Sequence, residues 1–173
     1  MKRITIFAAA LAALSACAFL PPVPIAVAEI GPTQGSKASG TATFVERSGK
    51  LIVDGHFKGL TPGQHGIHIH EKGDCSAPDA MSAGGHYNPT GEPHGAPDSA
   101  RHHGGDFGNL TADANGDATL NATLDSSRIG IGTLATNTVA GKALVIHADP
   151  DDLSSQPAGN SGTRVACGVI TMQ

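Results

Sequence analysis

Residues 71–107 constrain the fold of this 173-residue chain more than any other segment. The stretch is rich in Gly, Pro, Asp and His and has almost no apolar periodicity, so it predicts neither a helix nor a strand. An irregular loop of this length is uncommon inside a compact domain unless another agent orders it. Bound metal and a disulfide are the two obvious agents, and the stretch contains candidate residues for both.

The sequence on either side of this loop predicts short strands and shows no sustained helical period. We expect strands over residues 41–46, 51–53, 65–70, 143–147 and 165–171, and a hairpin over 109–124 around Asn115-Gly116. Residues 59–63 and 148–163 predict further loops. Many short strands joined by Gly-rich turns are typical of an all-β sandwich or barrel, which is the fold class we expect.

The amino terminus predicts export from the cytoplasm. Lys2 and Arg3 precede an apolar run over residues 4–20, which is the pattern of a signal peptide. A membrane anchor is the alternative, but the run is at the short end of the roughly 17–25 residues that a span needs, and Pro21 follows at once. We therefore expect an export signal over residues 1–28, an unpatterned linker over 29–37 and one folded domain over 38–173.

Two processing sites compete within this signal. Residues 26–28 have the small-x-small pattern of ordinary cleavage, here before Glu29. Residues 14–17 resemble a bacterial lipobox, in which Cys17 would be acylated and would anchor the protein to a membrane. The position of Cys17 at the end of the apolar run favours the lipobox, and the alternative is that Cys17 is discarded with the signal. Either route predicts a mature protein in the periplasm or cell envelope.

Charge and cysteine content narrow the function classes. The formal charge of the chain is −4, and residues 1–28 carry two basic residues and no acid, so their removal gives −6. With no basic patch, one Tyr and no Trp, the domain is not expected to bind nucleic acid. Cys75 and Cys167 are the cysteines left in the domain, and in an exported protein such a pair predicts a disulfide, with two free thiols as the alternative.

The main functional signal is the set of nine histidines. His68 and His70 are two residues apart in a predicted strand, where successive side chains alternate between faces. Both rings therefore point to one side and can bind one metal ion, while Ile67 and Ile69 point to the other. The pair alone is a weak motif.

Further candidate ligands strengthen this signal. Four of them lie in the irregular loop and one ends a predicted strand: His86, His94, His103, Asp106 and His147. Four imidazoles suit Cu(II), and three imidazoles with one carboxylate suit Zn(II). The six histidines and one aspartate are one ligand short of two separate four-ligand sites. A single shared imidazole would resolve the deficit.

Six ordered segments carry a family resemblance: residues 65–71, 84–89, 94–95, 103–109, 145–149 and 162–170. Together they resemble the copper,zinc superoxide dismutase family over about residues 38–171. The resemblance implies an eight-stranded Greek-key β-barrel or sandwich with two long functional loops. It also implies one copper ion bound by His68, His70, His86 and His147, and one zinc ion bound by His86, His94, His103 and Asp106.

The resemblance implies roles for residues around these ligands. Asp151 matches an aspartate that joins His68 to His94 through their outer ring nitrogens, which fixes ring orientation. The alternative is an ordinary acid of the loop. His65 matches a histidine that packs under the copper site, and we expect His56 on a strand surface.

One pair of neighbouring histidines is ambiguous. His102 and His103 are adjacent, and either could reach a metal ion. The His-x-x-Asp spacing of the family selects His103 as the zinc ligand.

The implied activity is dismutation of superoxide to dioxygen and hydrogen peroxide through a copper redox cycle. His86 would carry a proton, and Arg164 would dock the anion beside the open copper position, the alternative for Arg164 being a surface ion pair. A periplasmic copper or zinc carrier without turnover is the main alternative function, but it needs neither a bridging histidine nor this arginine. A hydrolytic zinc enzyme is less favoured because four protein ligands leave zinc no open position.

The sequence departs from the eukaryotic pattern in two places. Cys75 follows His70 by only five residues, which resembles the bacterial branch of the family. The second loop, 148–163, has three aspartates and no lysine where eukaryotic members carry steering lysines. We therefore nominate Lys72 as a second steering charge, with an ordinary solvated lysine as the alternative. The departure also leaves open whether the protein is a monomer or a homodimer.

Overall fold

The computed structural model describes residues 25–132 and 136–173. Eight strands dominate it: β1 (Ile25–Pro32), β2 (Ser39–Arg47), β3 (Lys50–Lys58), β4 (Gly63–His70), β5 (Asp106–Ala112), β6 (Ala118–Asp125), β7 (Ala143–His147) and β8 (Arg164–Met172). Within the described ranges, the helical structure is the short 3₁₀ turn η1 (Met81–Ala83). The prediction of an eight-stranded all-β domain is confirmed.

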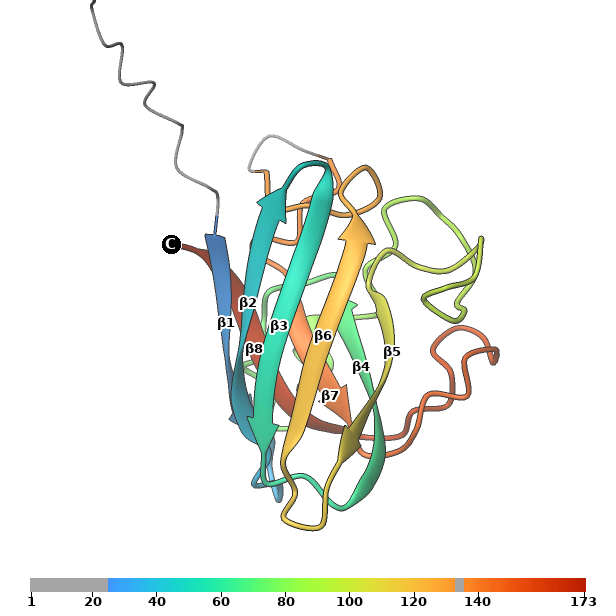
Figure 1. The fold of residues 1–173 in the computed structure, drawn as a ribbon. Helices are drawn as coiled ribbons and strands as arrows, with labels where there is room; N and C mark the ends of the chain where they lie inside the picture. Colours follow the sequence, from blue (N-terminus) through green and yellow to red (C-terminus); the bar gives the residue numbers. More distant parts are fainter. Residues whose placement is uncertain (1–24, 133–135) are drawn as a thin grey trace, which may run out of the picture.

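The strands form one antiparallel sheet that curves into a nearly closed barrel (Figure 1). Their order is β5-β4-β7-β8-β1-β2-β3-β6, so β5 and β6 are the two edges. These edges lie against each other without forming a hydrogen-bonded ladder. The long loop that follows β4 and the loop that follows β7 extend from the same side of the barrel (Figure 1).

The hairpin predicted over residues 109–124 is wrong. Strands β5 and β6 do form there, and a tight turn joins them, with Gly116 N donating to Asp113 O over 3.0 Å. However, β5 pairs with β4 and β6 pairs with β3, so the two strands separate after the turn. Local turn chemistry predicted the reversal of the chain, but the partners of each strand are set by distant segments.

The linker predicted over residues 29–37 is also corrected. Glu29 to Pro32 belong to β1, which starts at Ile25 and pairs with β2 on one side and β8 on the other. Ala26, Ala28 and Ile30 alternate along β1 and are buried in the core. Their period of two is that of a half-buried strand, which the small-x-small interpretation of residues 26–28 concealed.

The barrel core follows from the same alternation in the other strands. In β2, Ala42 and Phe44 are buried, and in β3, Leu51, Val53 and Phe57 are buried, while their neighbours point outward. A fully buried Phe or Leu side chain contributes about 1.5–3 kcal/mol relative to an exposed one. The core thus provides a rigid support for the loops. No helix among the described residues is long and apolar enough to cross a bilayer.

Candidate metal centre

Strand β4 faces the core with one side and a histidine cluster with the other. Ile67 and Ile69 are fully buried in the apolar core, as the strand alternation predicted. His68 and His70 point to the opposite side, and β7 pairs with β4 through His68↔Val145 and His70↔Ala143. This ladder brings His147, the last residue of β7, to the same side of the sheet.

Backbone hydrogen bonds hold His86 opposite His70. Tyr87 N donates to Ile69 O over 2.7 Å, and Glu71 N donates to Gly85 O over 2.9 Å, so this part of the loop runs alongside the end of β4. The other end of the loop is attached in the same way, because Ile69 N donates to Gly105 O over 2.9 Å. The long loop is therefore ordered by main-chain bonds as well as by side chains.

Two groups of candidate ligands result, and they share His86. We call one the strand cluster: His68, His70, His86 and His147. We call the other the loop cluster: His86, His94, His103 and Asp106. In each cluster the candidate ligand atoms all lie within 4.8 Å of one another. These are the only groups of three or more possible ligand residues in the described part of the chain.

In each ring of the strand cluster, one nitrogen is hydrogen-bonded to an oxygen atom outside the cluster. His70 Nδ1 donates to Gly84 O over 2.9 Å, and His147 Nδ1 donates to Gly162 O over 3.3 Å. The Nε2 atoms of these two rings lie 3.3 Å apart and face the centre. His68 Nδ1 and His86 Nε2 complete the set.

In the loop cluster, three rings surround one fully buried carboxylate. His86 Nδ1 is 2.9 Å from Asp106 Oδ1, His94 Nδ1 is 3.0 Å from Oδ2, and His103 Nδ1 is 3.2 Å from Oδ1. The backbone N–H groups of His103 and Gly95 also donate to Asp106 Oδ2, over 2.9 and 3.2 Å. The carboxylate thus both completes the ligand set and fixes the loop around it.

The buried polar atoms of the two clusters fit metal ions. His68 Nδ1 and His86 Nε2 are buried and make no hydrogen bond. His94 Nδ1 and His103 Nδ1 are also buried, and although they lie 3.0 and 3.2 Å from Asp106, these contacts lack hydrogen-bond geometry. A buried nitrogen without a partner is costly, and native proteins rarely contain one unless it has another role. Here the four atoms point to the centres of the two clusters, where metal ions would be their partners.

The two clusters shift histidine pKa values in opposite directions. In the strand cluster, burial lowers the pKa of His70 to about 2 and that of His147 to about 3. Burial also lowers the pKa of the shared His86 to about 4, although Asp106 opposes this. For His94, burial acts in the same direction, but the carboxylates of Asp106 and Asp151 outweigh it and raise the pKa to about 9.

Asp151 joins the two clusters from behind. Its Oδ2 accepts a hydrogen bond from His68 Nε2 over 2.7 Å, and its Oδ1 accepts one from His94 Nε2 over 2.9 Å. Asn109 holds the backbone of Asp151 at both ends, with distances of 2.7 and 2.9 Å. The structure therefore places Asp151 where the sequence expected it, and it adds Asn109 as its support.

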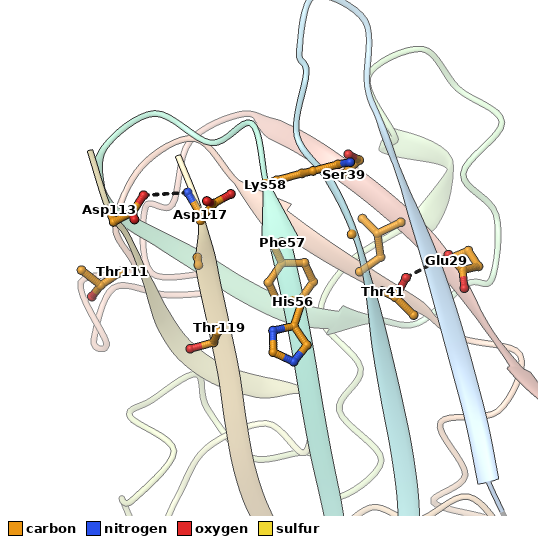
Figure 2. A pocket seen from close by; sticks show the side chains of 13 residues that line it. Glu29, Ser39, Thr41, His56, Phe57, Lys58, Thr111, Asp113, Asp117 and Thr119 are labelled. Atoms are coloured by element: carbon orange, nitrogen blue, oxygen red, sulfur yellow. Dashed lines mark hydrogen bonds between the residues drawn. The ribbon is translucent and has the colours of Figure 1, made fainter. Parts of the chain in front are cut away.

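The remaining histidines lie outside both clusters. His65 is buried, with Nδ1 2.8 Å from His147 O and Nε2 2.8 Å from Thr61 O, so it connects β4 to the end of β7. His102 is buried beside the loop cluster, where it bonds His103 O and Arg128. His56 is exposed and lines a depression of about 790 Å³ on the outer face of β1, β2, β3 and β6, together with Thr41 and Thr119 (Figure 2).

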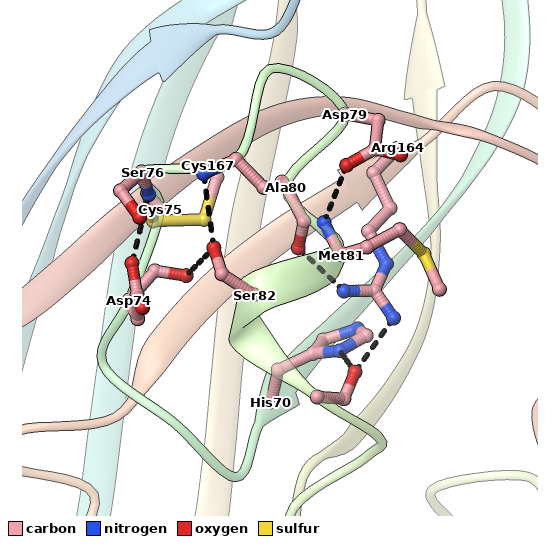
Figure 3. Close-up of a disulfide and its surroundings, with 12 residues drawn as sticks. His70, Asp74, Cys75, Ser76, Asp79, Ala80, Met81, Ser82, Arg164 and Cys167 are labelled. Carbon is pink, nitrogen blue, oxygen red and sulfur yellow. Dashed lines mark hydrogen bonds between the residues drawn. A yellow bond between two sulfur atoms is a disulfide. The ribbon is translucent and has the colours of Figure 1, made fainter.

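Cys75 and Cys167 form a disulfide that joins the long loop to β8 (Figure 3). Their Cα atoms are 5.8 Å apart, within the normal range for such a bond. The same loop accepts two hydrogen bonds from Arg164, whose Nη1 donates to Ala80 O and whose Nη2 donates to Gly84 O, each over 2.6 Å. The disulfide and Arg164 thus hold one stretch of loop against the strand.

Arg164 and the strand cluster share a groove of about 1110 Å³. His70, His86 and His147 line it, and Arg164 lies directly opposite His147 across the β7–β8 ladder. Lys37, from the turn between β1 and β2, also lines this groove, whereas Lys72 does not. A small anion that enters the groove would therefore reach the strand cluster past these two positive charges.

Sequence reasoning missed several residues that position the site. Gln156 holds the backbone of His94, with its Oε1 accepting from His94 N and its Nε2 donating to His94 O, both over 2.9 Å. Asn109, Arg128 and the Gly84 carbonyl have similar supporting roles. Each contact joins segments far apart in the chain, so no local spacing signals it. Asn109 and Gly84 had a weak signal, because each stands at an end of one of the segments that carry the resemblance.

Comparisons with known proteins agree with this geometry. Residues 38–170 match the family model described as copper/zinc superoxide dismutase. A solved structure described as "Crystal Structure Analysis of the clock protein EA4" is 34% identical and superposes with a TM-score of 0.76, covering 89% of this chain and 98% of that chain. The chain belongs to the copper/zinc superoxide dismutase family.

Proposed function

We propose that this protein dismutes superoxide to dioxygen and hydrogen peroxide with one copper and one zinc ion per chain. The observation that carries the proposal is the pair of four-ligand clusters that share His86, beside the groove that Arg164 lines. Copper in the strand cluster would supply one-electron redox chemistry, whereas zinc in the loop cluster, which has no such chemistry, would supply charge and ligand orientation.

His86 is the residue that we expect to move a proton. Its Nε2 faces the strand cluster and has no hydrogen-bond partner, while its Nδ1 is held beside Asp106. Burial lowers the pKa of His86 to about 4, so the metal-free ring is neutral at neutral pH. With zinc bound in the loop cluster, Nδ1 would carry no proton, so Nε2 could accept one and the ring would stay neutral. A superoxide that gains one electron beside it would take this proton and a second one from solvent to form hydrogen peroxide.

Arg164 is the residue that we expect to bind the anion. Burial lowers the pKa of its guanidinium, but an arginine remains charged at any working pH. The two hydrogen bonds to loop carbonyls fix the position of this charge. Asp79, the acid that lines the same groove, partly offsets it.

Lys37 is better placed than Lys72 to assist Arg164. Both lysines are exposed, but Lys37 lines the groove and Lys72 follows β4 outside it. The second loop, 148–163, contains no lysine or arginine, and its charged residues are Asp149, Asp151 and Asp152. We therefore extend the steering proposal from Arg164 and Lys72 to Lys37, with Lys37 as the stronger of the two lysines.

We also propose that the protein is exported and belongs to the bacterial branch of its family. The early position of Cys75 supports the branch, and the charged, apolar amino terminus supports export. Cleavage before Glu29 would remove the buried Ala26 and Ala28 and half of β1. Processing upstream of Ile25, such as acylation of Cys17, would leave β1 intact; Cys17 itself lies outside the described residues.

The cleavage proposal is tested by the mass of the mature amino terminus. Protein purified from an exporting bacterial host should begin upstream of Ile25 and, if Cys17 is acylated, carry the mass of the lipid. An unlipidated terminus at Glu29 on a folded protein would refute both the intact β1 and the lipid anchor.

Metal content and superoxide turnover test the main proposal. Protein reconstituted with both metals should hold one copper and one zinc ion per chain and should remove superoxide catalytically. The His147→Ala variant should lose copper and turnover, whereas His56→Ala, which changes an exposed histidine outside both clusters, should keep them. Full metal content without turnover would instead support a copper and zinc carrier.

A further inference from the structure

His102 makes two short contacts that leave it outside the metal clusters. Its Nδ1 is 2.6 Å from His103 O, and its Nε2 is 2.6 Å from Arg128 Nη1. The residue is buried, with 4% of its surface exposed. A buried ring beside two clusters of ligands that takes no part in either needs another explanation.

The partners of His102 fix its tautomer. A carbonyl oxygen can only accept a hydrogen bond, so Nδ1 carries the proton that is donated to His103 O. A guanidinium can only donate, so Nε2 is unprotonated and accepts from Arg128. The ring is therefore neutral, and both of its nitrogens are satisfied in one orientation.

His102 completes the restraint on the backbone of His103. The carbonyl of His103 accepts from His102 Nδ1 and also from Asp106 N, over 3.2 Å. The N–H of His103 donates to Asp106 Oδ2 over 2.9 Å. With its N–H and its C=O both held, His103 can move its ring only by side-chain rotation.

His103 is the group of the loop cluster nearest to solvent. Its side chain is 9% exposed, compared with 2% for His86 and none for His94 or Asp106. A chelator or a water molecule therefore reaches the cluster first at His103. Release of a bound ion should begin with this ligand, so whatever holds His103 should control the rate of release.

Arg128 anchors this arrangement to the barrel. Its Nη2 donates to Ala100 O over 2.9 Å, so one guanidinium binds the long loop at two points. Arg128 belongs to the segment after β6, and Ile131 in that segment donates its N–H to Glu46 Oε2 of β2 over 2.9 Å. The segment of Arg128 and Ile131 thus connects the long loop to β2.

We propose that His102 is a positioning residue that holds the zinc ligand His103 through its carbonyl, and that Arg128 locks His102, so that the pair slows the release of zinc. The inference rests on the proposed zinc site but not on catalysis. Partners that orient a metal ligand from outside the ligand set typically change metal affinity by about 10–100-fold when they are removed.

The test is the rate at which zinc moves from the full metal-loaded protein to a colorimetric chelator. His102→Ala and Arg128→Ala should each release zinc about tenfold faster or more, and the double variant should be no faster than the faster single variant, because the two residues act as one unit. His102→Asn, whose amide can still donate near the position of Nδ1, should recover part of the slow rate.

Arg101→Ala is the matched control. Arg101 is next to His102, but its side chain is 72% exposed and pairs with Glu92 on the surface. Its removal should change the zinc release rate by less than about twofold, as expected for an exposed pair. Thermal unfolding and cobalt substitution, whose visible spectrum reports the ligand geometry, separate a misplaced His103 from a general loss of fold.

The proposal is overturned if His102→Ala and Arg128→Ala release zinc at the rate of Arg101→Ala. It is also overturned if the double variant shows the two effects simply multiplied. Failure of the proposed function would look different. The wild-type protein would still bind zinc and release it slowly, but it would not turn over superoxide.

Discussion

The two candidate metal clusters are built in different ways although they share His86. In the strand cluster, His68, His70 and His147 stand on β4 and β7, so the barrel ladder sets their spacing. In the loop cluster, His94 and His103 stand on an irregular loop and Asp106 is the first residue of β5. Strand geometry alone can align imidazoles, whereas a loop needs a central carboxylate and clamps from other segments.

The two clusters also differ in charge, because only the loop cluster contains an acid. The strand cluster contains no acid, and burial keeps the rings of His70 and His147 neutral by lowering their pKa values. The loop cluster surrounds Asp106, whose pKa is held well below its usual range by His103, His86 and His94 against the effect of burial. Charge pairing therefore stabilises the loop cluster even without a bound ion.

Loss of the central carboxylate should have the largest effect on this difference. Asp106→Asn should abolish zinc binding and destabilise the protein by about 3–5 kcal/mol, because it removes one partner of a buried charge pair. Copper binding by the strand cluster should weaken much less. Asp98→Asn, which changes an exposed acid of the same loop, is the control for metal analysis and denaturant unfolding. Equal loss of both metals from Asp106→Asn would show that the clusters are not built independently.

Loss of the disulfide should affect the loop more than the strands. The bond closes 92 residues of chain, and such bonds typically stabilise a fold by about 2–4 kcal/mol. Replacing Cys75 and Cys167 by Ser should lower the unfolding temperature and increase amide exchange in residues 71–85, with little change in β4. If amide exchange in β4 and β7 increased as much as in residues 71–85, the barrel strands would not hold their histidines independently of the disulfide.

The pH dependence of the metal-free protein should separate the clusters. Below about pH 6.5 the unfolded chain binds protons at His70, His86 and His147 that the folded chain does not, so stability falls as the pH falls. Above pH 6.5 the folded chain keeps a proton on His94 that the unfolded chain loses, so stability also falls as the pH rises towards about 9.

The expected curve therefore has a maximum near pH 7, because three histidines act on the acid side and one on the alkaline side, with changes of about 1 kcal/mol per histidine for each pH unit. Urea unfolding at a series of pH values checks it. His94→Gln should remove the decline on the alkaline side and leave the acid side in place. A curve that rises steadily from pH 5 to 9 would rule out the raised pKa of His94.

The smallest effects concern access to the strand cluster. Because exposed charges are screened over about 8 Å at physiological salt, the rate of superoxide removal should fall as ionic strength rises. Arg164→Gln should lower the rate at low salt by about fivefold, since a neighbouring unit charge contributes about 1 kcal/mol in water. Lys37→Gln should lower it by about twofold, and Lys72→Gln by less. A wild-type rate that is independent of salt would exclude attractive steering.

Alternation along the sequence predicted the barrel strands and the shared face of His68 and His70, whereas the full ligand set of the strand cluster was implied by the family resemblance. Residues 41–46 and 143–147 have the composition of strands, and His68 and His70 share a face for the same reason. The loop residues were assigned through the family resemblance, since no local period places His94 beside Asp106. The pairing of β5 and β6 with separate partners, and the clamps from Gln156 and Arg128, depend on contacts between distant segments.

One carbonyl oxygen binds both a candidate metal ligand and the arginine that we propose binds the anion. Gly84 O accepts from His70 Nδ1 and from Arg164 Nη2 (Figure 3). Gly84 has a φ of 76°, which favours glycine. Both lone pairs are therefore in use, and the peptide cannot turn towards one donor without losing the other. Because His70 stands on β4 and Arg164 on β8, a shift of the loop would weaken both hydrogen bonds together. The orientation of the imidazole and that of the guanidinium therefore depend on one and the same peptide group.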